Sequence, residues 1–146
     1  MREPGGLSSN RVTALALDRS RRLWVGTQGK GASVLQPDRA TWGLVNEFDG
    51  LPSDTVTVLE AEGDTLWIGT PRGLALWNGA EISGTLPDGT GPSPFASNSI
   101  SGIAVLGDTV WIATLRGVYR SLRSSRLAAW DSVAAGARAR TKRGAR

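Results

Sequence analysis

The chain has 146 residues, no cysteine and no histidine, and a formal net charge of +4. It therefore has no disulfides, no thiolate or imidazole metal ligands, and no nucleophilic triad that depends on cysteine or histidine. Five of the 17 basic residues and none of the 13 acidic ones follow Ser132, so the basic excess belongs to the C-terminal tail.

The first predicted unit covers about residues 7–48. A turn-forming Leu-Ser-Ser-Asn segment leads into the apolar run 12–17, and a second apolar block follows at 23–27. Gly31 then marks a tight connection to a third apolar segment, and a fourth strand is predicted around 41–48. The apolar runs are four to six residues long and lack the 3.6-residue period of a helix, so we expect strands.

The same order of parts recurs over about residues 51–92 and 95–133, where the first apolar runs, and so the first predicted strands, cover 56–59 and 100–105. The block Leu23-Trp24-Val25-Gly26-Thr27 returns at 66–70 and at 110–114, which places its tryptophans 43 and 44 residues apart. Gly73 and Gly117 follow these blocks as Gly31 follows the first, and Trp130 marks the fourth strand of the third unit. Units of about 44 residues with four short strands each are typical of β-propeller blades.

The repeat predicts an all-β fold: a partial β-propeller of three four-stranded antiparallel blades over residues 1–133. Residues 134–146 are rich in alanine, arginine and glycine and have no apolar stripe. We expect them to form a basic, disordered tail with electrostatic but unselective affinity for polyanions.

The repeated tryptophans sit inside apolar strands, and a propeller blade packs both of its faces against neighbouring blades. Trp24, Trp67 and Trp111 are therefore predicted to pack between blades. The alternative is that they form an aromatic platform for sugars or bases.

Polar residues recur at two points of each unit, before the first strand and between the second and third strands. Propellers often bind ligands on the face where these loops meet, so we expect these positions to be the ligand-binding residues. The alternative is local turn chemistry with solvated charge. The residues are Asn10, Lys30, Asp54, Arg72, Asn98 and Arg116.

No pattern predicts catalysis, a metal or a cofactor. Glu60, Glu62 and Asp64 lie close together, but they are expected in a solvated hairpin turn, with a catalytic or Ca²⁺ site as the alternative. The glycines of 26–31 lack the spacing of a phosphate-binding loop, and the basic run 19–22 is expected in a turn between strands. We therefore expect that the chain is not an enzyme and does not bind a specific nucleic acid.

The blocks Leu-Pro-Ser-Asp-Thr-Val at 51–56 and Leu-Trp-Ile-Gly-Thr-Pro-Arg-Gly-Leu at 66–74 resemble the two-component regulator propeller repeat. The resemblance extends over about residues 7–120. In that family such repeats build seven-bladed propellers in the exported sensor part of hybrid histidine kinases and in related surface proteins. The resemblance implies a sensing or binding module of a larger sensor protein, with an oligosaccharide or protein ligand and a periplasmic or extracellular location.

Residues 1–10 lack the charged-then-apolar order of a secretory signal, and no apolar run is long enough for a membrane span. Three blades would leave two apolar blade faces uncovered, which a monomer rarely tolerates. We expect further blades of a longer polypeptide or of partner copies to cover them. The alternative is a truncated fragment with no activity of its own.

Overall fold

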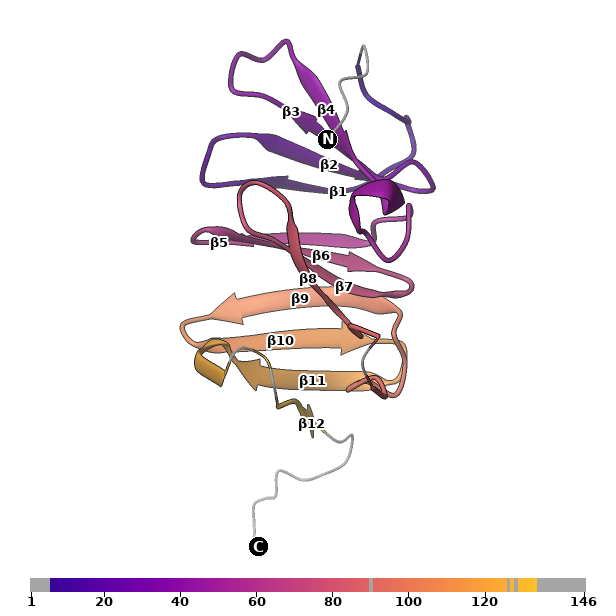
Figure 1. Cartoon of the computed structure of the whole chain (residues 1–146), viewed down its shortest axis with the longest axis vertical. Coiled ribbons are helices and arrows are strands. Elements are labelled where there is room, and N and C mark those ends of the chain that lie inside the picture. The colour runs from indigo at the N-terminus through magenta and orange to yellow at the C-terminus, as the bar shows by residue number, and fades with distance from the viewer. Residues whose placement is uncertain (1–5, 90, 126, 128, 134–146) are drawn as a thin grey trace, which may run out of the picture.

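The computed structural model describes residues 6–89, 91–125, 127 and 129–133, and it shows three four-stranded antiparallel sheets stacked on one another (Figure 1). We call them blades 1, 2 and 3. Blade 1 holds β1 (Val12–Leu17), β2 (Leu23–Thr27), β3 (Ala32–Leu35) and β4 (Trp42–Val45). Blade 2 holds β5 (Val58–Glu62), β6 (Thr65–Thr70), β7 (Gly73–Trp77) and β8 (Ile82–Leu86). Blade 3 holds β9 (Ile100–Leu106), β10 (Thr109–Thr114), β11 (Gly117–Leu122) and β12 (Asp131–Val133).

Within each blade every strand pairs with the next one along the chain, so the all-β fold of three four-stranded blades is confirmed. Short 3-10 turns, η1 (Glu47–Asp49) and η2 (Arg123–Ser125), follow β4 and β11. None of the helical turns among the described residues is long and apolar enough to cross a bilayer. The predicted tail, 134–146, lies outside the described residues.

Three predicted strand boundaries are wrong. The fourth strand of blade 3, expected to carry Trp130, begins one residue later, at Asp131. The strand expected over 41–48 ends at Val45, because Asn46 caps η1: its side chain accepts a hydrogen bond from the Phe48 backbone N–H at 2.9 Å. The first strand of blade 2 begins at Val58 although its apolar run begins at Val56. The Val56 N–H donates instead to the Thr27 carbonyl of blade 1, at 2.9 Å.

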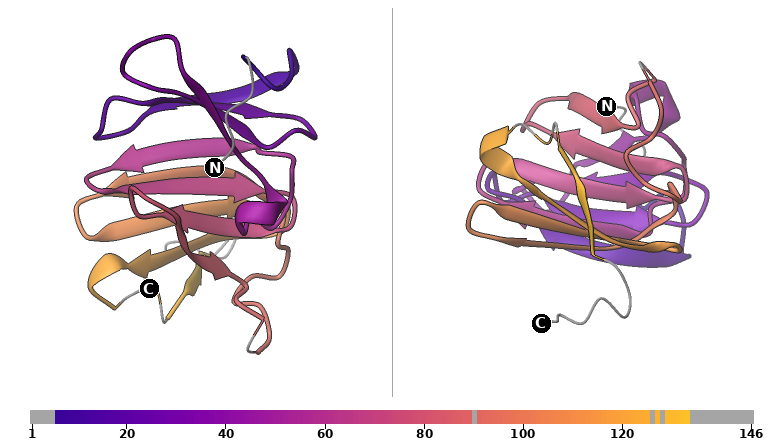
Figure 2. Two further views of the ribbon diagram at one scale, coloured as in Figure 1. Left: turned by 45° about the horizontal axis from the view of Figure 1, so that its top comes forward. Right: turned by 90° about the horizontal axis from the view of Figure 1, so that it is seen from below.

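The blades pack face to face, with their first strands β1, β5 and β9 next to one another (Figure 2). Two threonine hydroxyls, one in β1 and one just before β5, donate to a backbone carbonyl of the following blade: Thr13 to Val56, and Thr57 to Ile100. Both pairs are 43 residues apart, so the same contact joins blade 1 to blade 2 and blade 2 to blade 3.

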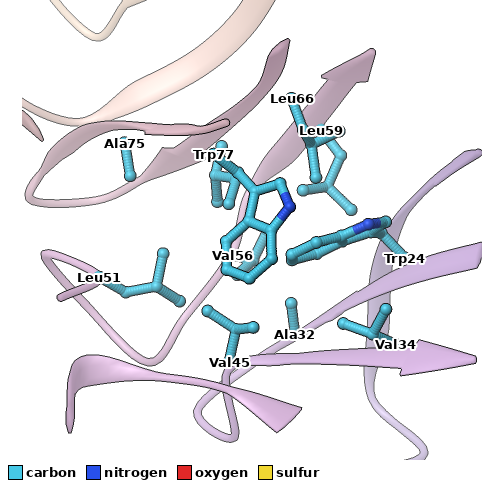
Figure 3. Packing of buried hydrophobic residues seen from close by; sticks show 11 residues of the cluster. Trp24, Ala32, Val34, Val45, Leu51, Val56, Leu59, Leu66, Ala75 and Trp77 are labelled. Atoms are coloured by element: carbon cyan, nitrogen blue, oxygen red, sulfur yellow. The ribbon is translucent and has the colours of Figure 1, made fainter. Parts of the chain in front are cut away.

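The core between blades 1 and 2 is built around two tryptophans. Trp24 and Trp77 are 0% and 3% exposed, and their rings meet edge to face with centroids 4.9 Å apart (Figure 3). Val34, Val45 and Leu59 surround them. Such a pair adds about 0.5–1.5 kcal/mol to the stabilisation from burial, which makes this interface the aromatic centre of the first two blades.

A second core of equivalent construction lies between blades 2 and 3. Trp67 is 2% exposed and packs with Leu74, Ile100 and Tyr119. The prediction that Trp24 and Trp67 pack between blades is confirmed, and their burial leaves neither available as a binding platform.

Trp111 departs from the prediction, because it is only half-buried. Its neighbours in β10, Val110 and Ile112, are buried against blade 2, so the alternation of the strand turns Trp111 to the opposite face. The Arg120 guanidinium lies 5.7 Å from its ring centroid. No blade covers this face in the described part of the chain.

Candidate functional site: a polar rim at one end of the blades

The six residues expected to bind ligand all lie at the same end of the three stacked blades. In an antiparallel blade the start of the first strand, the end of the second and the start of the third are adjacent, as the pairing of Val12 with Thr27 shows. The rim consists of the residues at these points. They are Asn10, Lys30, Asp54, Arg72, Asn98 and Arg116.

A threonine at the end of each second strand holds the turn that carries the basic rim residue. Its hydroxyl donates to the carbonyl of the glycine that closes the turn, and it accepts from the backbone N–H of the basic residue. The threonine hydroxyl lies 2.7, 2.8 and 3.0 Å from the glycine carbonyl oxygen in the pairs Thr27–Gly31, Thr70–Gly73 and Thr114–Gly117. The same hydroxyl lies 3.2, 3.1 and 3.0 Å from the backbone nitrogen of Lys30, Arg72 and Arg116.

The closing glycines have left-handed backbone angles, with φ of 74°, 134° and 112° at positions 31, 73 and 117. A Cβ at Gly73 would lie 2.5 Å from the Leu86 carbonyl oxygen. The predicted tight connections are therefore confirmed. Lys30, Arg72 and Arg116 each immediately precede the closing glycine, although the turn of blade 1 is one residue longer, and all three are exposed.

Two of the other three rim residues, Asp54 and Asn98, are bound into the links between blades. Asp54 accepts from the Glu47 N–H at 2.8 Å and donates its own N–H to the Glu47 carboxylate at 2.9 Å. Its carbonyl also accepts from Gly31 at 2.6 Å, which ties the link to blade 1. Asn98 accepts from the Ser93 hydroxyl. Asp54 and Asn98 are half-buried and shape their loops, while Asn10 is exposed.

The opposite end of the blade 1–blade 2 interface holds a cluster that the sequence did not predict. The Asp18 carboxylate accepts from the Arg22 Nε at 2.9 Å and from the Trp24 indole Nε1 at 2.8 Å. Arg22 also donates to the Gly79 carbonyl of blade 2 at 3.0 Å and lies 5.8 Å from the Trp77 ring centroid. A hollow of about 470 Å³ opens beside this cluster.

The expectation of a solvated basic turn over 19–22 thus holds for Arg19 and fails for Arg22. The Arg22 side chain is 12% exposed and joins two blades, whereas Arg19 is exposed and pairs with Asp64 at 3.2 Å. An acid four residues before an arginine across a hairpin turn is the only sequence pattern that points to this cluster. The Gly79 carbonyl that accepts from Arg22 is 57 residues away, and no sequence pattern near Arg22 indicates this contact.

The three neighbouring acidic residues of blade 2 were expected in one hairpin turn, but only one of them lies there. Glu60 and Glu62 lie within β5, and only Asp64 stands in the turn. Among the residues that the structure describes, no three acids come close enough to hold a metal ion. The Ca²⁺ alternative therefore gains no support.

Asp38, in the turn between β3 and β4, is bound by its own turn. Its carboxylate accepts from the Thr41 hydroxyl at 2.6 Å and from the N–H groups of Thr41 and Ala40 at 2.9 and 2.8 Å. These bonds, the Thr41 hydroxyl first, hold the pKa of Asp38 below its ordinary value. Asp38 is thus a turn-forming carboxylate at the end away from the rim.

Comparison with known proteins confirms the resemblance found in the repeat. Residues 6–29 match the family model of the two component regulator propeller. A similar solved structure is the extracellular domain of a hybrid two component system protein from B. thetaiotaomicron, with a TM-score of 0.70 and 23% sequence identity. The match covers 83% of this chain but 17% of that one, so the chain spans a small part of the longer structure. No curated protein matches the sequence.

Proposed function

We propose that the three blades form a non-catalytic module that senses or binds a ligand outside the cytoplasm, as part of a larger two-component sensor-type protein. The family match at residues 6–29 and the fold shared with an extracellular domain support this proposal. Further blades, in the parent chain or in other copies, complete the propeller. Ligand binding is assigned to the rim.

The observation that carries the proposal is the repeated geometry of the basic residues. Lys30, Arg72 and Arg116 come from three different blades, yet the same pair of threonine bonds sets the backbone of each. A row of exposed cations on rigid turns suits an extended anion better than a neutral ligand. Of the expected ligands, an acidic oligosaccharide matches this row best.

The test measures binding of polygalacturonate by titration calorimetry on the full chain, with dextran as the neutral counterpart. The variant K30Q/R72Q/R116Q removes three rim charges and should weaken polygalacturonate binding at least tenfold. The control variant R19Q/R21Q/R39Q removes three charges from turns at the other end. Because both variants keep the basic tail and have the same net charge, equal losses would reject the rim as the site.

A second candidate is a fragment with no independent activity. It is favoured by large apolar side chains that stay exposed on the outer blades, such as Leu15 at 62% and Leu106 at 80%. Light scattering separates this candidate from a working module, since a fragment with bare apolar faces should aggregate.

A further inference from the structure

The hollow beside the Asp18–Arg22 pair lies in an interface that already has both of its blades. Its volume is about 470 Å³, and its walls come from the β1–β2 turn of blade 1 and from the β5–β6 and β7–β8 turns of blade 2. Further blades would pack on the outer faces of blades 1 and 3, away from these walls. Small-molecule sites have volumes of about 300–1,000 Å³, so the hollow is large enough for one.

A wall of the hollow holds a buried hydrogen-bond donor that lacks an acceptor. Trp77 lines the hollow and is 3% exposed, and its Nε1 has no hydrogen-bond partner among the described residues. Figure 3 shows this nitrogen on the side of the ring that is turned towards Trp24, whose own indole N–H is bonded to Asp18 at the hollow. A buried N–H of this kind gains stability when an oxygen reaches it from the hollow.

The repeat does not require a donor at this position. At the equivalent point of the strand register blade 1 has Leu35 and blade 3 has Ser121. A leucine side chain has no donor, and the Ser121 hydroxyl donates to the Ala129 carbonyl of its own blade. Trp77 therefore brings to the hollow an N–H that the blade fold can do without.

The turn across the hollow from Trp77 departs from the repeat as well. Leu17 and Leu23 pair across five turn residues, whereas the equivalent pairs of blades 2 and 3 enclose four. This longer turn carries Arg22, which donates to the Gly79 carbonyl at 3.0 Å. The wall that blade 1 contributes is thus fixed to blade 2.

The charges in the walls are paired. The Arg22 guanidinium lies 2.9 Å from the Asp18 carboxylate, and the Arg19 guanidinium lies 3.2 Å from that of Asp64. A charged ligand would have to break one of these pairs or enter without a partner, which costs free energy in a partly buried site. The walls therefore favour an uncharged ligand.

Asn78 adds a second donor to the walls. Its side-chain oxygen accepts from the backbone N–H groups of Ala80 and Glu81, each at 2.9 Å. The amide nitrogen of Asn78 is therefore the group left for a ligand. Together with the Trp77 indole it calls for oxygen acceptors on the ligand.

We infer that the hollow binds a small uncharged molecule with a carbonyl or hydroxyl oxygen that accepts from the Trp77 indole N–H. The site lies at the opposite end of the blades from the rim, and it goes beyond the proposed function. An amide carbonyl and a sugar hydroxyl offer the same acceptor chemistry, so the experiment uses one probe of each kind.

The experiment follows the indole N–H signals of the full chain by ¹H–¹⁵N NMR, after triple-resonance assignment of its six tryptophans. The uncharged probes are N-acetylglycinamide and glucose, and N-acetylglycine is the charged counterpart of the first. We expect at least one uncharged probe to shift the Trp77 signal. The Trp67 signal should stay in place, because its N–H is buried and unpartnered in the described structure but lies outside the hollow.

The W77F variant keeps a ring and loses the N–H, so it should bind the active probe at least tenfold more weakly, measured by saturation-transfer NMR. W67F should bind it as the wild type does. If neither uncharged probe shifts the Trp77 signal, water alone fills the hollow and the inference is overturned. An equal shift with N-acetylglycine would overturn it too.

The rim variant K30Q/R72Q/R116Q separates this inference from the proposed function. It should bind the active probe as the wild type does, since its changes lie at the other end of the blades. A loss of polygalacturonate binding alone would concern the rim, and a Trp77 signal that no uncharged probe shifts would concern the hollow.

Discussion

Tryptophans at the same position of the repeat have different surroundings. The Trp24 indole donates to Asp18 at 2.8 Å, while the Trp67 Nε1 is buried and has no hydrogen-bond partner among the described residues. Trp111 is half-buried beneath Arg120. The repeat thus determines where the ring lies, whereas the residues around each ring determine whether the indole N–H has a hydrogen-bond partner.

Replacing Trp24 and Trp67 singly with phenylalanine should separate the hydrogen bond from the packing. Both variants lose a similar volume of buried ring, but only W24F loses a bond to a charged acceptor, which is worth about 1–3 kcal/mol. We therefore expect W24F to lower the free energy of unfolding more than W67F by about that amount, measured by urea denaturation. Equal losses would show that the Asp18 bond contributes nothing measurable.

At the scale of the element, β6 is the strand through which blade 2 approaches blade 3. Gly69 lies opposite Val58 in its own blade, and an added Cβ would come 2.4 Å from Val58 and 2.8 Å from Ile100. The strand can lie this close to β9 because position 69 has no side chain. A glycine is therefore required at position 69 for blades 2 and 3 to pack this closely.

G69A should destabilise the protein by about 1–3 kcal/mol, since the methyl group has to displace side chains on both sides. Gly84 in β8 offers a matched control, because a Cβ there would meet nothing within 4 Å. G84A should change the free energy of unfolding by less than about 1 kcal/mol. A G69A variant as stable as G84A would mean that the blades separate at little cost.

At the scale of the whole molecule, blade 2 differs from the other two because both of its faces are buried. The core around Trp24 covers one face and the core around Trp67 covers the other. Stacked units of this kind are stabilised by their nearest neighbours, so an end unit has half the contacts of the middle one. The middle blade should therefore be the last to open.

Amide hydrogen exchange can test this order. We expect the β6 amides of Trp67 and Ile68 to exchange more slowly than the equivalent β2 amides of Trp24 and Val25 and the β10 amides of Trp111 and Ile112. The comparison should be made at a concentration where the chain is monomeric. If the three strands exchanged at one common rate, the blades would open together as a single unit.

The repeat alone determined most of the architecture. Strands over 12–17 and 23–27, the turn glycines and the burial of Trp24 and Trp67 follow from local patterns: period-two alternation, glycine where φ is positive, and a rare residue repeated at a blade spacing. The regular placement of Lys30, Arg72 and Arg116 at one end is a consequence of the same repeat.

Tertiary structure decided the features that depend on partners distant in the chain. Arg22 joins two blades because Gly79 supplies a carbonyl 57 residues away, and Val56 leaves its strand to bond with Thr27. Trp111 shares its motif with two buried tryptophans and is half-buried because its face lacks a neighbour. A strand pattern specifies which side is apolar, whereas burial and long-range hydrogen bonds depend on what lies across the interface.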